Sequence, residues 1–117
     1  MARLSTHVLD MTKGGAAAGV RIELHRFDAE GLPRHLATTV TNADGRTDEP
    51  LLAGDSLTAG TYRLTFHVGD YFTRAGSADA CRFLREVPVV FGIDDPAGKY
   101  HVPLLVSPWG YSTYRGS

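Results

Sequence analysis

The chain has 117 residues, a net charge of −1 with acidic and basic residues interspersed, and a single cysteine, Cys81. This length suits one domain, residues 1–117, and the balanced charge gives no reason to expect a nucleic-acid or membrane partner. One cysteine excludes an internal disulfide framework and is typical of a reducing compartment. No stretch approaches the roughly 18 apolar residues of a membrane span, and the N-terminus has no apolar signal core. We therefore expect a cytoplasmic protein.

Alternation of apolar and polar residues predicts most of the elements, and all of these are strands. In residues 3–10, the side chains of Leu4 and Val8 share one face and that of His7 lies on the other. Residues 20–27 alternate in the same way and form the clearest strand, with one apolar and one polar face. The remaining predicted strands, in chain order, are residues 60–69, 86–92, 99–107 and 110–115.

Turn-forming segments separate these strands. "NADGR" at 42–46 carries an Asp-Gly pair suited to a tight turn, and "DDPAGK" at 94–99 has the composition of a β-hairpin turn. The segment "GSADACRFLRE", residues 76–86, is the one predicted helix. Ser77 can cap it, and its arginines lie toward the end where the helix dipole favours cations. One short helix among seven or eight strands predicts an all-β sandwich.

Two features near the end of the chain are unusual. Pro103 falls inside a predicted strand, where it cannot donate a ladder hydrogen bond. We expect it at a sheet edge, or where that side of the strand meets something other than a neighbouring strand. The final "WGYSTYRGS" keeps a tryptophan, two tyrosines and an arginine in positions that are usually frayed and small. Some contact must hold this terminus in place.

Three polar residues lie where a simple core would not place them. His7 and His101 are on the less apolar faces of their strands, and Arg46 directly follows the Asp-Gly turn. Each residue taken alone is most often an ordinary solvent-exposed side chain. Histidine nevertheless takes up and releases a proton near neutral pH, which suits acid–base catalysis. The other histidines, which we interpret as surface or structural residues, are His25, His35 and His67.

The spacing of these residues predicts no reaction by itself. Five histidines would suit a metal site, yet no His-x-His, His-Glu-x-x-His or Cys-x-x-Cys spacing occurs. A serine hydrolase is equally poorly supported, because the chain has no Gly-x-Ser-x-Gly motif. Gly14 and Gly15 do not begin a phosphate-binding loop, since the lysine and hydroxyl residue of that motif are missing.

Three segments together resemble the 5-hydroxyisourate hydrolases, the transthyretin-related enzymes of urate breakdown. They are "LSTHVLD", "NADGRT" and "YHVPLLVSPWGYSTYRGS". The likeness runs from Leu4 to Ser117, and the terminal Tyr-Arg-Gly-Ser separates these enzymes from transthyretin, the vertebrate thyroid-hormone carrier of the same fold. The resemblance implies a transthyretin-like two-sheet β-sandwich with hydrolase activity.

The resemblance also implies which residues carry the activity. The implied catalytic residues are His7, Arg46, His101 and Ser117. The implied substrate-binding residues are His7, Arg46 and Tyr114. Arg115 is expected to anchor the tail. Lys99 stands where many members of the family have a histidine, and this position is not central to the catalytic set.

The implied assembly is a homotetramer. Two sandwiches join edge to edge, and two such dimers pack face to face around a channel that holds the active sites. The implied reaction needs neither a metal nor an organic cofactor. Water opens the N1–C6 amide bond of 5-hydroxyisourate to give 2-oxo-4-hydroxy-4-carboxy-5-ureidoimidazoline. In such an assembly the aromatic residues of the last strand are expected to be buried, which would explain the unusual terminus.

Two other functions stay open at this point. A non-enzymatic small-ligand carrier of the transthyretin type would use an apolar channel without a cluster of histidine and arginine residues. A structural or adhesion domain would need neither a polar interface nor an ordered C-terminus.

Overall fold

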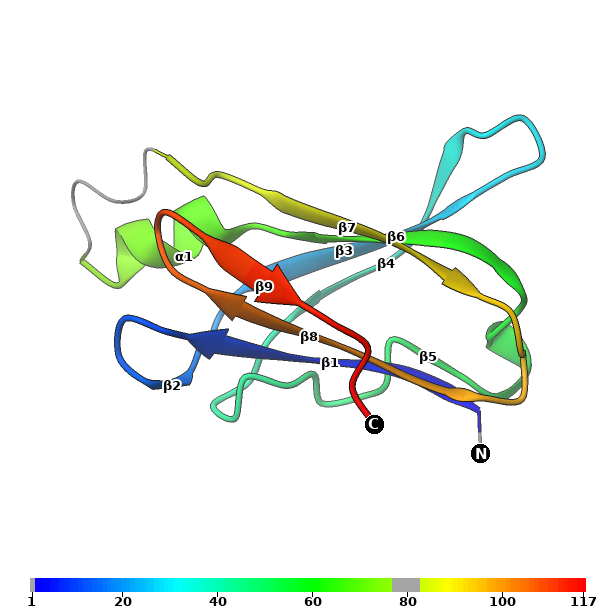
Figure 1. The fold of residues 1–117 in the computed structure, drawn as a ribbon, viewed down its shortest axis with the longest axis horizontal. Coiled ribbons are helices and arrows are strands. Elements are labelled where there is room, and N and C mark those ends of the chain that lie inside the picture. Colours follow the sequence, from blue (N-terminus) through cyan, green and yellow to red (C-terminus); the bar gives the residue numbers. More distant parts are fainter. Residues whose placement is uncertain (1, 77–82) are drawn as a thin grey trace.

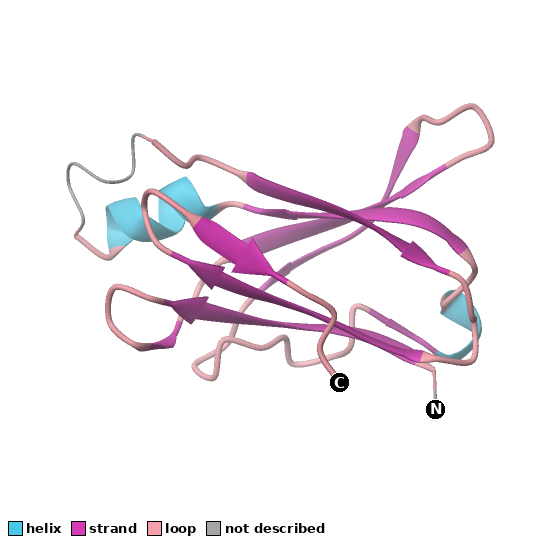
Figure 2. Cartoon of the chain, in the orientation of Figure 1, coloured by secondary structure: helices cyan, strands magenta, loops and turns pink. Residues whose placement is uncertain are grey.

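The computed structural model describes residues 2–76 and 83–117, which form a sandwich of two β-sheets (Figures 1 and 2). In chain order the elements are β1 (Arg3–Asp10), β2 (Gly15–Ala16), β3 (Arg21–Phe27), β4 (Pro33–Val40), β5 (Leu52–Ala53), the 3₁₀ turn η1 (Gly54–Ser56), β6 (Gly60–Phe66), α1 (Val68–Arg74), β7 (Val87–Ile93), β8 (Lys99–Val106) and β9 (Tyr111–Thr113). The predicted all-β sandwich is confirmed. No helix among these residues has the length and apolar character needed to cross a membrane.

The pairing of the strands sets the position of the polar residues. One sheet has the order β2-β1-β8-β9, with β5 also paired to β1, and the other has the order β4-β3-β6-β7. β1 and β8 run parallel, whereas the other ladders are antiparallel. The parallel register places Ser5 opposite His101 and His7 opposite Pro103. The two histidines identified in the sequence are therefore diagonal neighbours on adjacent strands.

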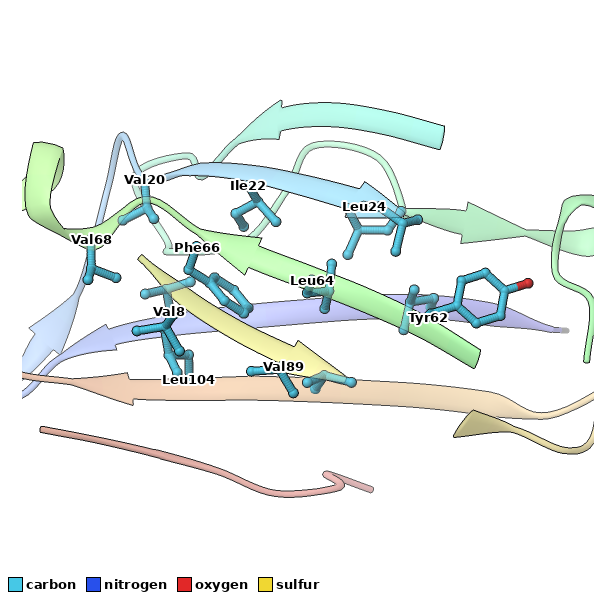
Figure 3. Close-up of a cluster of buried hydrophobic side chains, with 14 of the residues drawn as sticks. Val8, Val20, Ile22, Leu24, Tyr62, Leu64, Phe66, Val68, Val89 and Leu104 are labelled. Atoms are coloured by element: carbon cyan, nitrogen blue, oxygen red, sulfur yellow. The ribbon is translucent and has the colours of Figure 1, made fainter. Parts of the chain in front are cut away.

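The core fills the space between the two sheets (Figure 3). The side chains of Leu4 and Val8 on β1 and of Ile22 and Leu24 on β3 are fully buried, so the predicted alternation is confirmed in both strands. Burying a side chain of this size contributes roughly 1.5–3 kcal/mol. Because successive residues of a strand point to opposite faces, the burial of Leu4 and Val8 turns His7 outward.

The α-helix of the described residues lies earlier in the chain than predicted. β6 ends at Phe66 instead of continuing to residue 69, and α1 follows it directly. The buried side chains of α1 include Val68, Tyr71 and Phe72, which have the i, i+3, i+4 spacing of a helix that packs one side on a core. This pattern is present in the sequence, but the regular alternation before it favoured a longer strand.

The helix predicted at 76–86 is not found where the structure can be compared with it. Residues 77–82 of that segment lie outside the described residues. Residues 83–86 form a turn followed by irregular backbone, so the prediction is wrong for this part.

Two further predictions differ from the structure. The turn at 94–99 forms, with the Gly98 N–H donating to the Asp95 carbonyl, but it connects β7 in one sheet to β8 in the other. The predicted hairpin is therefore wrong. The sequence analysis also missed β4, because most of its side chains are exposed and none of them is fully buried.

Candidate active site

The end of the chain runs from β9 across β8 toward β1 (Figure 1). A polar hollow of about 240 Å³ lies there, on the outer face of the five-stranded sheet. The residues that line it are Arg3, Ser5, Arg46, Lys99, Tyr100, His101 and Ser117. Three residues predicted from the sequence, Arg46, His101 and Ser117, thus meet in one place. They come from a loop, a strand and the chain terminus.

β1 and β8 supply the floor of this hollow. His101 is half-buried, and its Nδ1 atom lies 2.8 Å from the hydroxyl of Ser5 on the opposite strand. His7 follows two residues after Ser5 on the same outer face and lies beside the hollow without lining it. His7 is still close enough to His101 for its charge to act on the pKa of that imidazole.

The loop after the Asn-Ala-Asp-Gly sequence places Arg46. The Asn42 side-chain oxygen accepts the N–H groups of Asp44 and Arg46, and the Arg46 carbonyl accepts the Asn42 N–H at 2.7 Å. Gly45 joins this turn to β1, because its carbonyl accepts the Val8 N–H at 2.8 Å. Gly45 has φ +74°, and a Cβ atom there would overlap the Val8 carbonyl oxygen. The predicted tight turn is confirmed, and glycine is what lets it lie against the sheet.

The C-terminal tail, residues 114–117, is held to β8 by several contacts. The Gly116 N–H donates to the His101 carbonyl at 2.8 Å. The guanidinium of Arg115 lies 4.6 Å from the centre of the Tyr100 ring and donates to the Lys99 carbonyl at 3.4 Å. A Cβ atom on Gly116 would lie 2.5 Å from Cδ2 of His101, so the peptide backbone passes directly over the imidazole. These contacts bring Ser117 to the hollow.

Pro103 lies where the pairing of β8 and β9 lapses. The ladder stops at the Leu104–Thr113 pair and resumes only as the isolated bridge between His101 and Gly116. In the gap, the Pro103 carbonyl accepts a hydrogen bond from the Thr113 hydroxyl at 2.8 Å. Pro103 is therefore not at a sheet edge. It occupies the second environment expected for it, where no strand needs its missing N–H.

Tyr114 lines a different hollow. This one measures about 280 Å³, is mainly apolar, and lies between β7 and the β8–β9 pair, with Val89 and Phe91 in its wall. His101 lines both hollows, so the two adjoin at its ring. The structure thus does not bring Tyr114 into the polar hollow. In the single chain Tyr114 is exposed, as are Trp109 and Tyr111.

The surroundings of His101 favour its neutral form. Burial lowers the pKa of this imidazole, and the charges of Arg46, His7 and Arg3 lower it further. A backbone hydrogen bond with Ser5 acts in the opposite direction and is outweighed. A neutral imidazole at neutral pH is a proton acceptor, which suits a general base.

The hollow is cationic. Its lining includes three basic side chains, those of Arg3, Arg46 and Lys99, and no aspartate or glutamate among the described residues. Such a site suits a small ligand with carbonyl oxygens or a negative charge. Within residues 2–76 and 83–117, no three His, Cys, Asp or Glu side chains gather as a metal site would require.

The sequence analysis missed three lining residues, Arg3, Ser5 and Tyr100. Arg3 and Ser5 share the outer face of β1 with His7, so the alternation of that strand already marked them as outward-facing. What no local pattern revealed is that β1 pairs in parallel with a strand 96 residues later, as the contact between Ser5 and His101 shows.

The fold and this hollow together define a transthyretin-like sandwich with a polar site on the outer face of one sheet. The model of the HIUase/Transthyretin family matches residues 4–116, and the chain belongs to this family. A relative named 5-hydroxyisourate hydrolase 2, from Rhizobium meliloti (strain 1021), is 56% identical over 98% of this chain and 96% of its own length.

Solved structures show the same backbone in proteins of different names. The 5-hydroxyisourate hydrolase of Klebsiella pneumoniae has a TM-score of 0.82 at 41% identity, covering 100% of both chains. Transthyretin from Sparus aurata has a TM-score of 0.88 at 32% identity, covering 97% of this chain and 96% of its own. An (S)-allantoin synthase has a TM-score of 0.89 at 45% identity, and the match covers 99% of this chain but only 44% of that one. Since the backbone is shared by a hydrolase and a transthyretin, only the side chains of the hollow can distinguish the two functions.

Proposed function

We propose that this protein hydrolyses 5-hydroxyisourate in urate degradation and that the polar hollow around His101 is its active site. The observation that carries the proposal is the meeting of His101, Arg46 and Ser117 in one cationic hollow. They are three of the five residues implied by the likeness to the hydrolases, and they come from three separate segments. The full-length similarity to named 5-hydroxyisourate hydrolases supports the same reaction.

The proposed chemistry is the attack of water on a ring amide. Neutral His101 accepts a proton from the water as the new C–O bond forms at the carbonyl carbon. The C–N bond then breaks, and the leaving ring nitrogen takes up a proton that His7 delivers. His7 and His101 are diagonal neighbours on the same outer face of the sheet, so both can reach one small substrate held there. The same geometry also permits the two roles to be exchanged.

Arg46 is proposed to bind the substrate and to stabilise the developing oxyanion. Its guanidinium presents a planar set of donors that matches the oxygen and nitrogen edge of a urate-like ring. The Ser117 hydroxyl would hold the attacking water. Tyr114 would close the site from the adjoining apolar hollow. No step of this mechanism uses a metal or an organic cofactor.

The assembly proposed for the protein is a homotetramer, a dimer of dimers. Two observations support it: β7 and β9 are unpaired edges that flank one apolar hollow, and several large apolar side chains there are exposed in the single chain, namely Val90, Trp109, Tyr111 and Tyr114. A partner sandwich along these edges would cover them. A cytoplasmic location, consistent with the single cysteine, is part of the same proposal.

A carrier of the transthyretin type is the alternative that the fold allows. It would need an apolar binding surface, and the apolar hollow of this chain lies along the β7 and β9 edges that we propose as the subunit interface. The polar hollow is lined instead by three basic side chains and a histidine. Polar groups of this kind are suited to moving protons and orienting a heterocycle, so the hydrolase is the function that the site supports best.

The test is to follow the ultraviolet absorbance of 5-hydroxyisourate, freshly made by urate oxidase, with and without the protein. We expect the wild type to accelerate its loss above the spontaneous rate. His101→Asn and His7→Asn should each reduce the rate by a factor on the order of 10²–10⁴ while leaving the assembly intact. His35→Asn, at an exposed histidine of β4, is the control and should remain active. A wild-type protein that leaves the decay unchanged would favour a carrier or a scaffold.

A further inference from the structure

One contact beneath the proposed base has no assigned role. The Ser5 hydroxyl lies 2.8 Å from Nδ1 of His101, and both residues are half-buried where β1 and β8 run side by side. The parallel register places Ser5 directly opposite His101, so the contact is built into the sheet. It does not depend on a flexible loop.

The His101 ring is confined from a second side as well. The backbone of Gly116 passes over Cδ2, close enough that a Cβ atom there would lie 2.5 Å from it. Among the described residues no hydrogen-bond partner reaches Nε2, and this atom is not among the buried unpaired ones. Ser5 at Nδ1 and the tail at Cδ2 therefore leave Nε2 as the ring nitrogen that is free for a ligand or a water molecule.

The partner of Nδ1 decides which nitrogen of a neutral imidazole carries the proton. A hydroxyl can donate or accept, so the Ser5 hydroxyl at 2.8 Å can accept a proton that Nδ1 donates. With the proton on Nδ1, a neutral imidazole has an unprotonated Nε2.

We propose that Ser5 is a positioning residue for the reaction: its hydroxyl accepts the Nδ1–H of His101 and so presents the lone pair of Nε2 to water in the hollow. The inference rests on the proposed function, since it assigns to Ser5 the control of the base used there. It also explains why a small hydroxyl residue occupies a strand position that faces a cationic hollow.

Several charged groups surround this pair and set its titration. Arg3 and His7 face it from β1, Arg46 from the 42–46 loop and Lys99 from β8. The cations disfavour a second proton on His101. Loss of the Ser5 acceptor should disfavour it further, because the charged imidazole forms the stronger hydrogen bond.

The test compares Ser5→Ala and Ser5→Thr with the wild type in pH profiles of kcat and kcat/KM. We expect Ser5→Ala to lower kcat roughly two- to tenfold, the effect of one hydrogen bond, with little change in KM, and to move the acidic limb of kcat/KM to lower pH. Ser5→Thr keeps a hydroxyl at this position, so its kcat and the acidic limb of its kcat/KM profile should match those of the wild type. Thr38→Ala is the matched control, because it removes another hydroxyl that bonds a histidine ring, that of His35 at 2.7 Å, far from the hollow.

Long-range ¹H–¹⁵N correlation spectra provide a readout that does not depend on activity. They should show neutral His101 protonated on Nδ1 in the wild type and a mixture of tautomers, with a lower pKa, in Ser5→Ala.

The proposal is overturned if Ser5→Ala keeps the wild-type kcat, the wild-type acidic limb of kcat/KM and the wild-type tautomer of His101 while His101→Asn is inactive. It is also overturned if Ser5→Ala raises KM and changes nothing else. A wild type without hydrolase activity would overturn the proposed function instead. The spectra would then decide the Ser5 contact independently.

Discussion

Arg46 acts on the site in two separable ways, by its charge and by its shape. The charge lowers the pKa of His101, after burial the largest influence on that imidazole. The planar guanidinium supplies paired donors for the substrate, which a lysine ammonium cannot reproduce. Both effects depend on the Gly45 turn that holds the loop against β1.

Substitutions at Arg46 should separate charge from shape. Arg46→Gln removes the cation, so the pKa of His101 should rise, the inactive imidazolium should persist to higher pH, and the acidic limb of kcat/KM should move upward. Arg46→Lys keeps the charge, so the limb should stay in place while KM rises. The pH profiles of kcat/KM measure the position of the acidic limb, kinetics at fixed pH give KM, and proton NMR titration measures the pKa of His101.

The control for this pair is Arg34→Gln, which removes an exposed arginine of β4 that pairs with Asp28. It should leave the profile unchanged. If Arg46→Gln and Arg46→Lys both keep the wild-type limb, the electrostatic role assigned to Arg46 is wrong.

At the scale of elements, the tail continues from β9 and covers one side of the polar hollow. Its backbone bond to His101 and the stacking of Arg115 on Tyr100 fix a segment that would otherwise fray. Gly116 is needed because any side chain there meets the imidazole.

Gly116→Ala should therefore displace the tail and lower kcat/KM by roughly 10- to 100-fold, as small misplacements of catalytic groups do. The fold should survive, since the change affects only the end of the chain. Gly110→Ala is the matched control in the same segment, because its Cβ atom would meet nothing closer than the Ser107 hydroxyl at 4.0 Å. Equal activity of the two variants would remove the tail from the mechanism.

A second element-scale contact joins α1 to the end of β1. The buried carboxylate of Asp10 accepts hydrogen bonds from the Thr12 N–H at 2.9 Å, the Thr12 hydroxyl at 2.6 Å and the Tyr71 hydroxyl at 2.7 Å. Burial raises the pKa of Asp10, but these bonds and the charge of Lys13 outweigh it and hold the pKa below its ordinary value. Burial, with Asp10 itself, raises the pKa of Tyr71.

Tyr71→Phe should lower the free energy of unfolding by about 1.5–3 kcal/mol at neutral pH, the usual contribution of a hydrogen bond to a charged group. The pKa of Asp10 is lower in the folded state, so its stabilising effect is present above the unfolded pKa of about 3.9 and is lost as the pH falls through the folded value. The difference between wild type and variant should therefore narrow in acid. Denaturant unfolding at fixed protein concentration measures it.

The matched control for this contact is Tyr62→Phe. It removes a buried tyrosine hydroxyl that bonds the neutral Thr58, so its cost should not change with acid pH. A pH-independent cost in Tyr71→Phe would contradict the role assigned to the Asp10 carboxylate.

At the scale of the whole molecule, the two edges of the single sandwich differ in the side chains that they expose. The edge formed by β7 and β9 carries exposed aromatic and apolar side chains beside an apolar hollow. The opposite edge is β4, whose exposed residues include Leu36.

Native mass spectrometry should find four times the 12.7 kDa of one chain. Tyr111→Glu on β9 should disrupt this assembly and the activity, because a charge would be desolvated in the proposed interface. Leu36→Glu is matched to it, since Leu36 is 44% exposed and Tyr111 45%, and should leave the assembly unchanged. A monomer in the wild type, or a tetramer in both variants, would show that the interface lies elsewhere.

A strand could be predicted from the sequence where its own residues record which face is buried, and could not where the information lies in distant contacts. β1, β3, β6 and β8 were predicted because each has one buried face, which alternation records directly. β4 was missed because both of its faces are largely exposed. The turn at 94–99 has hairpin composition, but no local signal states that the next strand joins the other sheet.

The amino-acid sequence by itself determined the sandwich class, the outward direction of His7 and His101, and, through its likeness to the hydrolases, the residues to examine. The tertiary structure alone decided that Ser5 bonds His101, that the tail roofs the hollow, and that Tyr114 lines a separate one. The physical reason is that alternation reports which face of a strand is buried, whereas the register between strands distant in the chain arises only when the whole core packs.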